Sequence, residues 1–266
     1  MNQLPNIHFT DNYLLHPYNP VTVNLIGAGG TGSQMLTALA RMNHSLTALG
    51  HAGLQVTLYD DDKISEANLG RQLFAESEIG LYKSLALINR VNRFFGTNWK
   101  AITKKFCVKT LLKESNNGAA NINISCVDTV AARYEIATVL KEHAYIKNVG
   151  DKILYWMDCG NAQFTGQVIL STLVEIKQPD SKKFTPIATL PLVTDEFKLL
   201  LDNEVDNNEP SCSLAEALEK QDLYINSTIA NLAGSLLWQL FREGMVENRG
   251  FFVNLKDFRV QPLKVA

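Results

Sequence analysis

Up to residue 160, the chain alternates between short apolar runs and segments in which apolar residues recur every three or four positions. Short runs rich in β-branched residues are typical of buried strands, whereas the three- to four-residue recurrence is typical of helices. The strand-like runs are residues 21–26, 54–59, 99–106, 121–127 and 153–157. The helical segments between them are residues 31–43, 81–95 and 130–141.

Strands that alternate with helices in this way predict an α/β fold, with a Rossmann-like, mostly parallel sheet covered by helices on both faces. Residues 41–53 contain Asn43, Gly50 and Gly53, so we expect them to form a lengthened loop that returns to the second strand. The first strand, turn, helix and second strand then make one complete β-α-β unit.

The pattern changes after Gly160, because residues 167–176 resemble a strand that no helix follows. This favours a mixed or antiparallel C-terminal extension. Residues 177–211 contain four prolines and an acidic, Asn-rich stretch, which predicts a crossing loop. A long helix follows, with apolar residues at helical spacing from Ile225 to Leu240, and residues 251–260 are expected to close the fold with a strand.

These elements predict an N-terminal arm at 1–20, a nucleotide-binding domain at 21–160 and an extension at 161–266, within one continuous domain. Composition agrees, because 266 residues with 46% hydrophobic and 20% charged positions can build one substantial core. A formal net charge of -2 provides no basic field, so we expect no nucleic-acid partner.

The four cysteines form no C-x-x-C pair, which argues against a disulfide scaffold and against a zinc site. The first residues lack the pattern of a signal peptide, and no run of eighteen apolar residues occurs. We therefore expect a cytoplasmic protein with no membrane partner.

Four glycines, Gly27, Gly29, Gly30 and Gly32, follow the first strand. Glycines allow a sharp turn there, and the free N–H groups of the next helix can bind a phosphate. Asp60 ends the second strand, where a carboxylate can accept hydrogen bonds from ribose hydroxyls. NAD and ATP fit these features equally well, and a tight turn without a ligand remains an alternative.

Three polar residues shortly after the ribose carboxylate separate ATP activation from dinucleotide binding: Asn68, Arg71 and Lys83. Attack by a carboxylate on the α-phosphate builds negative charge that Arg and Lys can stabilise, and Asn68 can orient phosphate or metal-bound water. Asp128 ends a central strand, where its carboxylate suits Mg²⁺. The alternatives are a surface ion pair for Arg71, a solvated lysine for Lys83 and a helix N-cap for Asp128.

The order G-x-G-G-x-G, D-x-D, N-L-x-R-Q and G-x-x-K, from Gly27 through Asp60 and Asp62 to Lys83, resembles the ThiF/MoeB and ubiquitin-activating enzyme superfamily. The segment around Asp128 is similar to the D-C-x-D-N segment of these enzymes, where the aspartate binds magnesium. The resemblance covers residues 20–172 and, more loosely, 209–242. More narrowly, the chain looks like the ThiF family proteins of PRTRC systems.

The resemblance implies an enzyme, an adenylyltransferase that uses ATP and Mg²⁺ to activate the C-terminal carboxylate of a small ubiquitin-like or sulfur-carrier-like protein. It also implies a homodimer. The chain departs from the superfamily near its N-terminus, where many members carry an arginine, because its first arginine or lysine is Arg41. The segment before Val21 contains His8 and His16 and is expected to be a packing or partner arm.

Cys212 precedes a Ser-x-x-Glu capping box at residues 213–216, so a helix dipole would favour its thiolate form. In the superfamily, a cysteine of this region can accept the activated C-terminus, which makes Cys212 a candidate for a thioester. An ordinary semi-buried thiol is the alternative. Cys126 and Cys159 are expected in the core.

Two other functions remain open for this sequence. One is a non-catalytic, nucleotide-bound scaffold of the same fold, which the absent N-terminal arginine favours. The other is an NAD-dependent oxidoreductase or a cyclising dehydratase on the same type of sheet.

Overall fold

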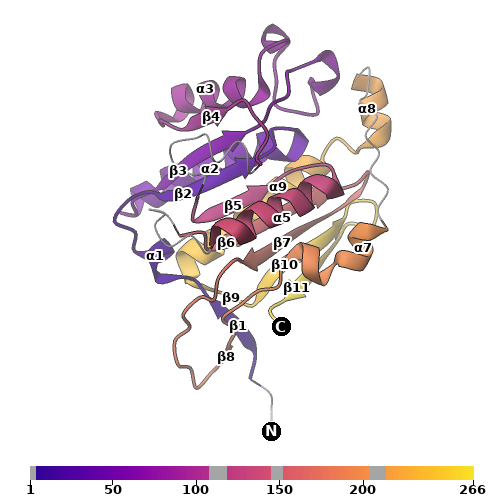
Figure 1. Cartoon of the computed structure of the whole chain (residues 1–266). Coiled ribbons are helices and arrows are strands. Elements are labelled where there is room, and N and C mark those ends of the chain that lie inside the picture. The colour runs from indigo at the N-terminus through magenta and orange to yellow at the C-terminus, as the bar shows by residue number, and fades with distance from the viewer. Residues whose placement is uncertain (1–3, 108–118, 145–151, 204–213) are drawn as a thin grey trace.

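The computed structural model describes residues 4–107, 119–144, 152–203 and 214–266. An eight-stranded sheet in the order β11-β10-β7-β6-β5-β2-β3-β4 runs through it (Figure 1). Five strands are parallel: β2 (Val21–Ile26), β3 (Leu54–Tyr59), β4 (Lys100–Ile102), β5 (Ile122–Ser125) and β6 (Tyr155–Asn161). The α/β class and the mostly parallel sheet predicted from the sequence are confirmed.

Three antiparallel strands extend the sheet beyond β6. They are β7 (Thr165–Thr172), β10 (Asn248–Asn254) and β11 (Arg259–Lys264). The predicted antiparallel extension is therefore present, and the C-terminus closes with a hairpin of two strands rather than with a single strand.

Helices cover both faces of the sheet. On one face lie α2 (Gly30–Ala48), α3 (Lys83–Phe95) and α9 (Ile225–Glu243), with α2 packed against both others. On the other face lies α5 (Val130–Ala144), which contacts the short α6 (Val193–Glu196). Figure 1 shows α5 in front of the sheet and α2 and α9 behind it. Each face has its own apolar cluster, and the parallel strands are buried on both sides, as is usual for such sheets.

The N-terminal segment forms part of a second, three-stranded sheet in the order β8-β1-β9. These strands are β8 (Thr185–Pro186), β1 (Asn6–Phe9) and β9 (Met245–Val246), and α1 (Asn12–Leu15) follows β1. His8 is fully buried, with Nδ1 2.7 Å from the Ile187 carbonyl oxygen and Nε2 3.0 Å from the Tyr155 hydroxyl. The first histidine of the arm thus has a packing role.

Local structure differs from the sequence prediction in two loops. Residues 41–48 continue α2, because Met42 and Leu46 are buried in the core and Asn43 accepts a hydrogen bond from the Leu54 N–H at 2.7 Å. The expected crossing loop at 177–211 contains α6 and α7 (Lys198–Asp202) in its described part. The remaining elements are α8 (Leu214–Lys220) and the 3-10 turns η1 (Glu66–Asn68) and η2 (Glu76–Glu78).

Strand β2 lies between β3 and β5. The chain leaves β2 for β3 and β4 on one side and then returns to β5 on the other. This reversal leaves a crevice beyond the carboxyl ends of β2 and β5, which is the usual ligand site of open α/β sheets.

Candidate functional site

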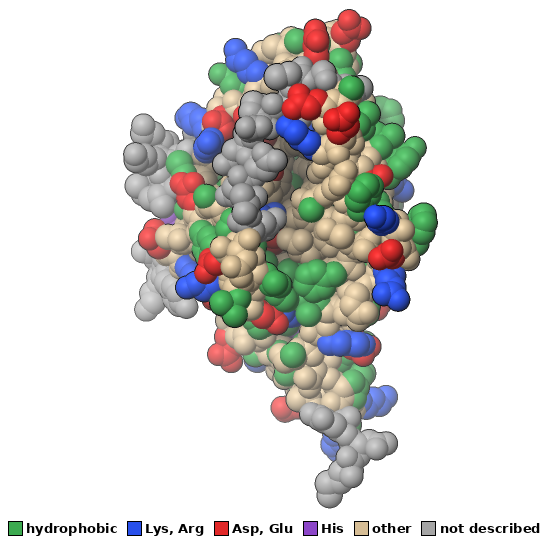
Figure 2. Space-filling model, turned by 90° about the vertical axis from the view of Figure 1, so that its right-hand side faces the viewer, with side chains coloured by type: hydrophobic (Ala, Val, Ile, Leu, Met, Phe, Trp, Pro, Cys, Tyr) green, Lys and Arg blue, Asp and Glu red, His purple; other side chains and the backbone are tan. Residues whose placement is uncertain are grey.

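A cavity of about 540 Å³ opens at this crevice. Figure 2 looks onto this side of the molecule and shows a hollow near the middle of the face. The lining comes from the ends of β2, β3, β5 and β6 and from the start of α9, so both halves of the chain contribute to it. The sequence-predicted residues in the lining are Gly27, Gly29, Gly30, Asp60, Asp62, Arg71, Lys83 and Asp128.

The glycine turn between β2 and α2 is held by close packing. Gly27 has φ of +95°, and a side chain there would lie 2.6 Å from the Cys126 carbonyl oxygen. A side chain at Gly32 would overlap the Gly27 carbonyl oxygen, and one at Gly30 would overlap the Asn226 carboxamide. Gly29 differs, because its Cβ would point into open space. Gly29, Gly30 and Thr31 all line the cavity, so the start of α2, where the first N–H groups of a helix have no partner within it, borders the space that an anion would occupy.

Asp60 accepts two backbone hydrogen bonds, one of which comes from the glycine turn. The Ala28 N–H donates to Oδ2 at 2.6 Å, and the Asp62 N–H donates to Oδ1 at 2.9 Å. Burial raises the pKa of the Asp60 carboxyl to about 6, although the Ala28 hydrogen bond and the charge of Lys83 act in the opposite direction. A carboxylate in this position can accept hydrogen bonds from a ribose.

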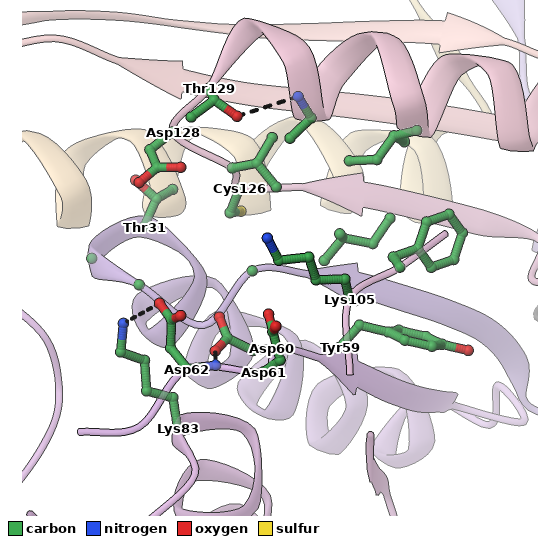
Figure 3. A pocket seen from close by; sticks show the side chains of 18 of the residues that line it. Thr31, Tyr59, Asp60, Asp61, Asp62, Lys83, Lys105, Cys126, Asp128 and Thr129 are labelled. Carbon is green, nitrogen blue, oxygen red and sulfur yellow. Dashed lines mark hydrogen bonds and ion pairs between the residues drawn. The ribbon is translucent and has the colours of Figure 1, made fainter. Parts of the chain in front are cut away.

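Lys83 reaches the cavity from the first turn of α3. Its ammonium lies 2.9 Å from Asp62 Oδ2, and Figure 3 shows this pair at the floor of the site. The lysine side chain is 9% exposed, whereas that of Asp62 is 67% exposed. The pair therefore holds a largely buried cation at the cavity wall, and Lys83 is not the solvated lysine that the sequence left as an alternative.

Arg71 lies in the chain between the two 3-10 turns and donates from Nη1 to the Gln221 side-chain oxygen. Burial lowers the pKa of its guanidinium, and the negative charge of Asp128 opposes that shift. Within the described residues, Arg71 Nε is buried without a hydrogen-bond partner. A buried donor of this kind is suited to an anionic ligand.

Asp128 is exposed and borders the cavity three residues after the end of β5. The following helix is capped by Thr129 instead, because the Thr129 hydroxyl accepts a hydrogen bond from the Ala132 N–H at 3.2 Å (Figure 3). The alternative of an N-cap at Asp128 is therefore wrong, and its carboxylate is available to the cavity.

A buried ion pair anchors the segment that carries Asp128. Arg133 Nε lies 3.2 Å from Asp158 Oδ2, and Arg133 Nη2 donates to the Val127 carbonyl oxygen at 3.1 Å. The Ser125 hydroxyl donates to Asp158 Oδ1 at 2.7 Å. These bonds tie the start of α5 to the ends of β5 and β6, so they position the backbone on which Asp128 stands.

Four polar side chains from distant parts of the chain meet beside the glycine turn. The Thr31 hydroxyl lies 3.0 Å from Asn226 Oδ1 and 3.2 Å from Asn161 Oδ1. Asn226 Nδ2 donates to the Gln221 side-chain oxygen at 2.9 Å. Gln221 also accepts from Arg71, so the network links the glycine helix to the arginine.

Asn68 is not part of the cavity lining. Its side-chain oxygen accepts hydrogen bonds from the Ser65 N–H at 2.9 Å and the Ser65 hydroxyl at 3.2 Å, which caps the turn η1. The structure thus gives Asn68 a local role in shaping the loop that carries Arg71. Its predicted contact with phosphate or metal-bound water stays a prediction.

Two cysteines lie side by side at the ends of β5 and β6. Cys159 is buried, as expected. Its hydrogen bond to Cys126 is the main cause that raises the pKa of its thiol, and burial is the second. Cys126 is only half-buried and borders the cavity, so its expected place in the core is only partly right. Cys212 and Ser213 lie outside the described residues.

Sequence reasoning missed several residues of the site. Lys105, which follows β4, borders the cavity in Figure 3, and Gln72 is 5% exposed at its wall. Gln72 stands beside Arg71 in the N-L-x-R-Q segment, which is a signal that could have identified it. Gln221 and Asn226 had no such signal, since only the fold brings the start of α9 to the glycine turn.

The apolar part of the lining lies toward β4 and α5. It consists of Ile26, Tyr59, Phe106, Val127 and Ile136. Such surfaces suit a planar base.

In the described ranges, no group of three His, Cys, Asp or Glu side chains is arranged to bind a metal ion. Within the same ranges, no helix is long and apolar enough to cross a membrane.

Comparison with known proteins gives one family match, to the ThiF family over residues 14–265. The ubiquitin-like modifier-activating enzyme 5 of Bombyx mori is 32% identical over 132 residues, which are 46% of this chain and 31% of that protein. The chain therefore spans about a third of the length of this curated relative.

Solved structures share the fold. PaaA aligns with a TM-score of 0.57 at 15% identity, over 92% of this chain and 64% of its own. E. coli MccB with ATP aligns with a TM-score of 0.55 at 14% identity, over 94% of this chain and 64% of its own. E. coli MccB with MccA-N7isoASN gives a TM-score of 0.55 at 15% identity, over 92% and 64%. The present chain spans just under two thirds of each.

Proposed function

The chain belongs to the ThiF family, and we propose that it uses ATP to adenylate the C-terminal carboxylate of a small ubiquitin-like or sulfur-carrier-like protein. The observation that carries the proposal is the placement of Arg71 and Lys83 on the wall of the cavity that the glycine turn also lines. A dinucleotide site for hydride transfer needs no such pair of cations beside its phosphate turn.

The described residues offer a suitable surface for each part of ATP: the base, the ribose and the phosphates. The apolar surface around Tyr59 and Phe106 would take the base, and Asp60 would accept hydrogen bonds from the ribose. The start of α2 would bind phosphate through its free N–H groups. Arg71, with its unpaired Nε, and Lys83 would balance the phosphate charge.

In the proposed reaction, an oxygen of the substrate carboxylate attacks the α-phosphorus of ATP. A new bond forms between that oxygen and phosphorus, the bond from the α-phosphorus to the bridging oxygen breaks, and pyrophosphate leaves. The product is an acyl-adenylate. Arg71 and Lys83 stabilise the negative charge that grows on the phosphate oxygens, because both are held in place before the reaction begins.

Magnesium fits the site in part. Asp128 offers a hard carboxylate oxygen at the phosphate end, and Mg²⁺ commonly uses one or two carboxylates together with phosphate oxygens and water. Bound there, the metal would neutralise phosphate charge. The superfamily resemblance implies magnesium, and we propose it as the metal. The resemblance also implies a homodimer, which we propose as the oligomeric state.

The type of substrate is supported by the names of relatives. The Bombyx mori protein is named for activating a ubiquitin-like modifier, and MccB has been solved together with MccA. Both names favour a protein or peptide substrate over a small metabolite. A subsequent transfer of the activated C-terminus to Cys212 is part of the proposal on the strength of the sequence resemblance.

Pyrophosphate exchange tests this function. Wild-type protein with Mg²⁺ and a carboxylate-terminated carrier protein should move labelled pyrophosphate into ATP. Arg71→Ala and Lys83→Ala should each reduce the exchange rate about 100-fold, because each removes a charge that stabilises the transition state. Thermal melts show whether each variant is folded.

Arg93→Ala is the matched control, since Arg93 is an exposed arginine near the end of α3 and outside the cavity. Its exchange rate should equal that of the wild type. Full exchange activity in both Arg71→Ala and Lys83→Ala would refute the mechanism. Tight ATP binding without exchange would favour a nucleotide-bound scaffold, and tighter binding of NAD than of ATP would favour an oxidoreductase.

A further inference from the structure

Asn161, the last residue of β6, has a side-chain amide whose hydrogen bonds are incomplete. The Thr31 hydroxyl lies within reach of the side-chain oxygens of both Asn161 and Asn226. A hydroxyl has only one hydrogen to donate, so it can satisfy only one of these two oxygens. Asn226 is the nearer of the two, at 3.0 Å against 3.2 Å, so the Thr31 hydrogen goes to Asn226 and the Asn161 carboxamide keeps hydrogen-bonding capacity to spare.

A second observation supports this reading. Within the described residues, Asn161 Nδ2 and Gln72 Oε1 are buried and have no hydrogen-bond partner. Both residues line the cavity, and Gln72 is 5% exposed. Leaving a buried polar atom unpaired costs about 1–3 kcal/mol, so two such atoms in the lining of one cavity point to a ligand that supplies the missing partners.

The position of Asn161 shows which part of the ligand it would contact. Strands β3 and β4, which carry the expected ribose and base surfaces, lie on one side of β2, whereas β5 and β6 lie on the other. Asn161 thus faces the site from the side of the glycine turn opposite to the base. The side chains that share its hydrogen-bond network, Thr31, Asn226 and Gln221, are uncharged, and Arg71 joins that network at Gln221 rather than at Asn161. An uncharged carboxamide suits a peptide better than pyrophosphate.

The segments that follow Asn161 and precede Asn226 each expose one aromatic side chain. Asn161 leads into the β6–β7 hairpin, where the Gln163 carbonyl oxygen accepts a hydrogen bond from the Asp222 N–H at 2.9 Å. The hairpin residue Phe164 is 36% exposed, and Tyr224, beside Asp222, is 66% exposed. A substrate tail that approached past these two side chains would meet Asn161.

We propose that the Asn161 carboxamide binds the last peptide unit of the substrate, next to the carboxylate that is activated. A carboxamide carries one donor group and one acceptor oxygen, as a peptide unit does, so the two can pair. This inference rests on the proposed function, and it adds the residue that recognises the main chain of the substrate tail. Because the contact is to the main chain, it is independent of the side chains of the tail.

Direct binding tests the assignment. The protein is saturated with AMPCPP, whose methylene bridge prevents cleavage, and titrated with acetyl-glycyl-glycine, which has no side chain to clash. We expect the Asn161→Ala variant to bind this peptide about tenfold more weakly than the wild type, the size expected for a lost hydrogen bond to a partly buried group. Its affinity for AMPCPP, measured in the same way, should fall by much less than its affinity for the peptide.

Asn161→Asp separates substrate binding from a structural role. Aspartate has the same shape and can still accept from Thr31, but it lacks the amide donor and would repel the peptide carboxylate. The peptide should therefore bind this variant more weakly than the wild type as well. The exposed Asn98, which is remote from the cavity, provides the control Asn98→Ala, for which no change is expected.

Equal peptide affinity in the wild type and Asn161→Ala, or wild-type affinity in Asn161→Asp, would overturn the assignment. If AMPCPP binds but the peptide does not bind the wild type, the inference fails while pyrophosphate exchange can still support the proposed function. If AMPCPP itself does not bind, the proposed function fails and the inference fails with it.

Discussion

Among single residues, Asp60 couples the chemistry of the site most directly to pH. Its pKa is raised from 3.8 to about 6, chiefly because burial disfavours the charged form. Between these two values the folded protein holds a proton that the unfolded chain has released. The contribution of Asp60 to stability is therefore greatest at low pH and decreases as the pH rises through about 6.

Nucleotide binding should show the opposite trend. Ribose hydroxyls donate to the ionised carboxylate, so the affinity for ATP should rise as the pH increases from about 5 to about 7.5, with a midpoint near the Asp60 pKa. Calorimetric titrations across this range measure the affinity. Asp60→Asn should bind ATP more weakly and lose this midpoint, and an unchanged pH profile in that variant would assign the dependence to another group.

Some residues of the site could be predicted from the sequence, and others could not. The residue types and spacing of Arg71, Lys83 and Asp128 predict phosphate chemistry, and all three border the cavity. The cap of α5 could not be assigned in advance, because adjacent Asp128 and Thr129 are both good N-caps and only the backbone geometry selects Thr129. Because Thr129 caps the helix, the Asp128 carboxylate remains available to a ligand in the cavity.

At the scale of elements, the start of α2 depends on glycines for two different reasons. Gly32 packs against the Gly27 carbonyl oxygen, whereas the Cβ position of Gly29 is open and borders the cavity. Gly32→Ala should lower the free energy of unfolding by about 2 kcal/mol or more, because the added methyl group meets backbone that cannot move freely. Denaturant titration measures this change.

Gly29→Ala is the matched variant at the same turn. Its free energy of unfolding should stay within about 1 kcal/mol of the wild type, since nothing in the structure meets the new methyl group. The affinity for ATP should nevertheless fall about tenfold or more, because the methyl group takes space where phosphate approaches the N–H groups. Wild-type ATP affinity in Gly29→Ala would show that phosphate does not bind at this turn.

Elements were predicted best where the pattern is long and periodic. The helices α3, α5 and α9 follow their apolar spacing closely. The sequence predicts that the helix after the glycine turn ends at residue 43, whereas α2 continues to Ala48. Polar and glycine residues at 43–53 are typical of a loop, but burial of Met42 and Leu46 holds residues 41–48 in the helix. Tertiary packing outweighed local propensity there, as it often does.

For the whole molecule, the cavity joins the two halves of the chain. Thr31 contacts both Asn161 and Asn226, and α2 packs along α9. We therefore expect one cooperative thermal transition rather than two. ATP at about 100 times its dissociation constant should stabilise the fold by about 2.7 kcal/mol, which raises the melting temperature by about 5–10 °C.

Scanning calorimetry with and without ATP tests this expectation, with NAD at the same concentration as the control. The whole transition should shift with ATP and remain in place with NAD. If two transitions appeared and only the earlier one moved, the halves would be independent units and the shared cavity would not couple them.

The sequence by itself determined the alternation of strands and helices, the glycine turn and the charged residues that follow it. Those features are local, since apolar periodicity, turn chemistry and motif spacing depend on residues that are close together in the sequence. Only the tertiary structure decided that Asn161, Gln221 and Asn226 meet at Thr31. Their meeting depends on β6 pairing beside β5 and on α9 packing against α2, which are long-range contacts that local sequence does not encode.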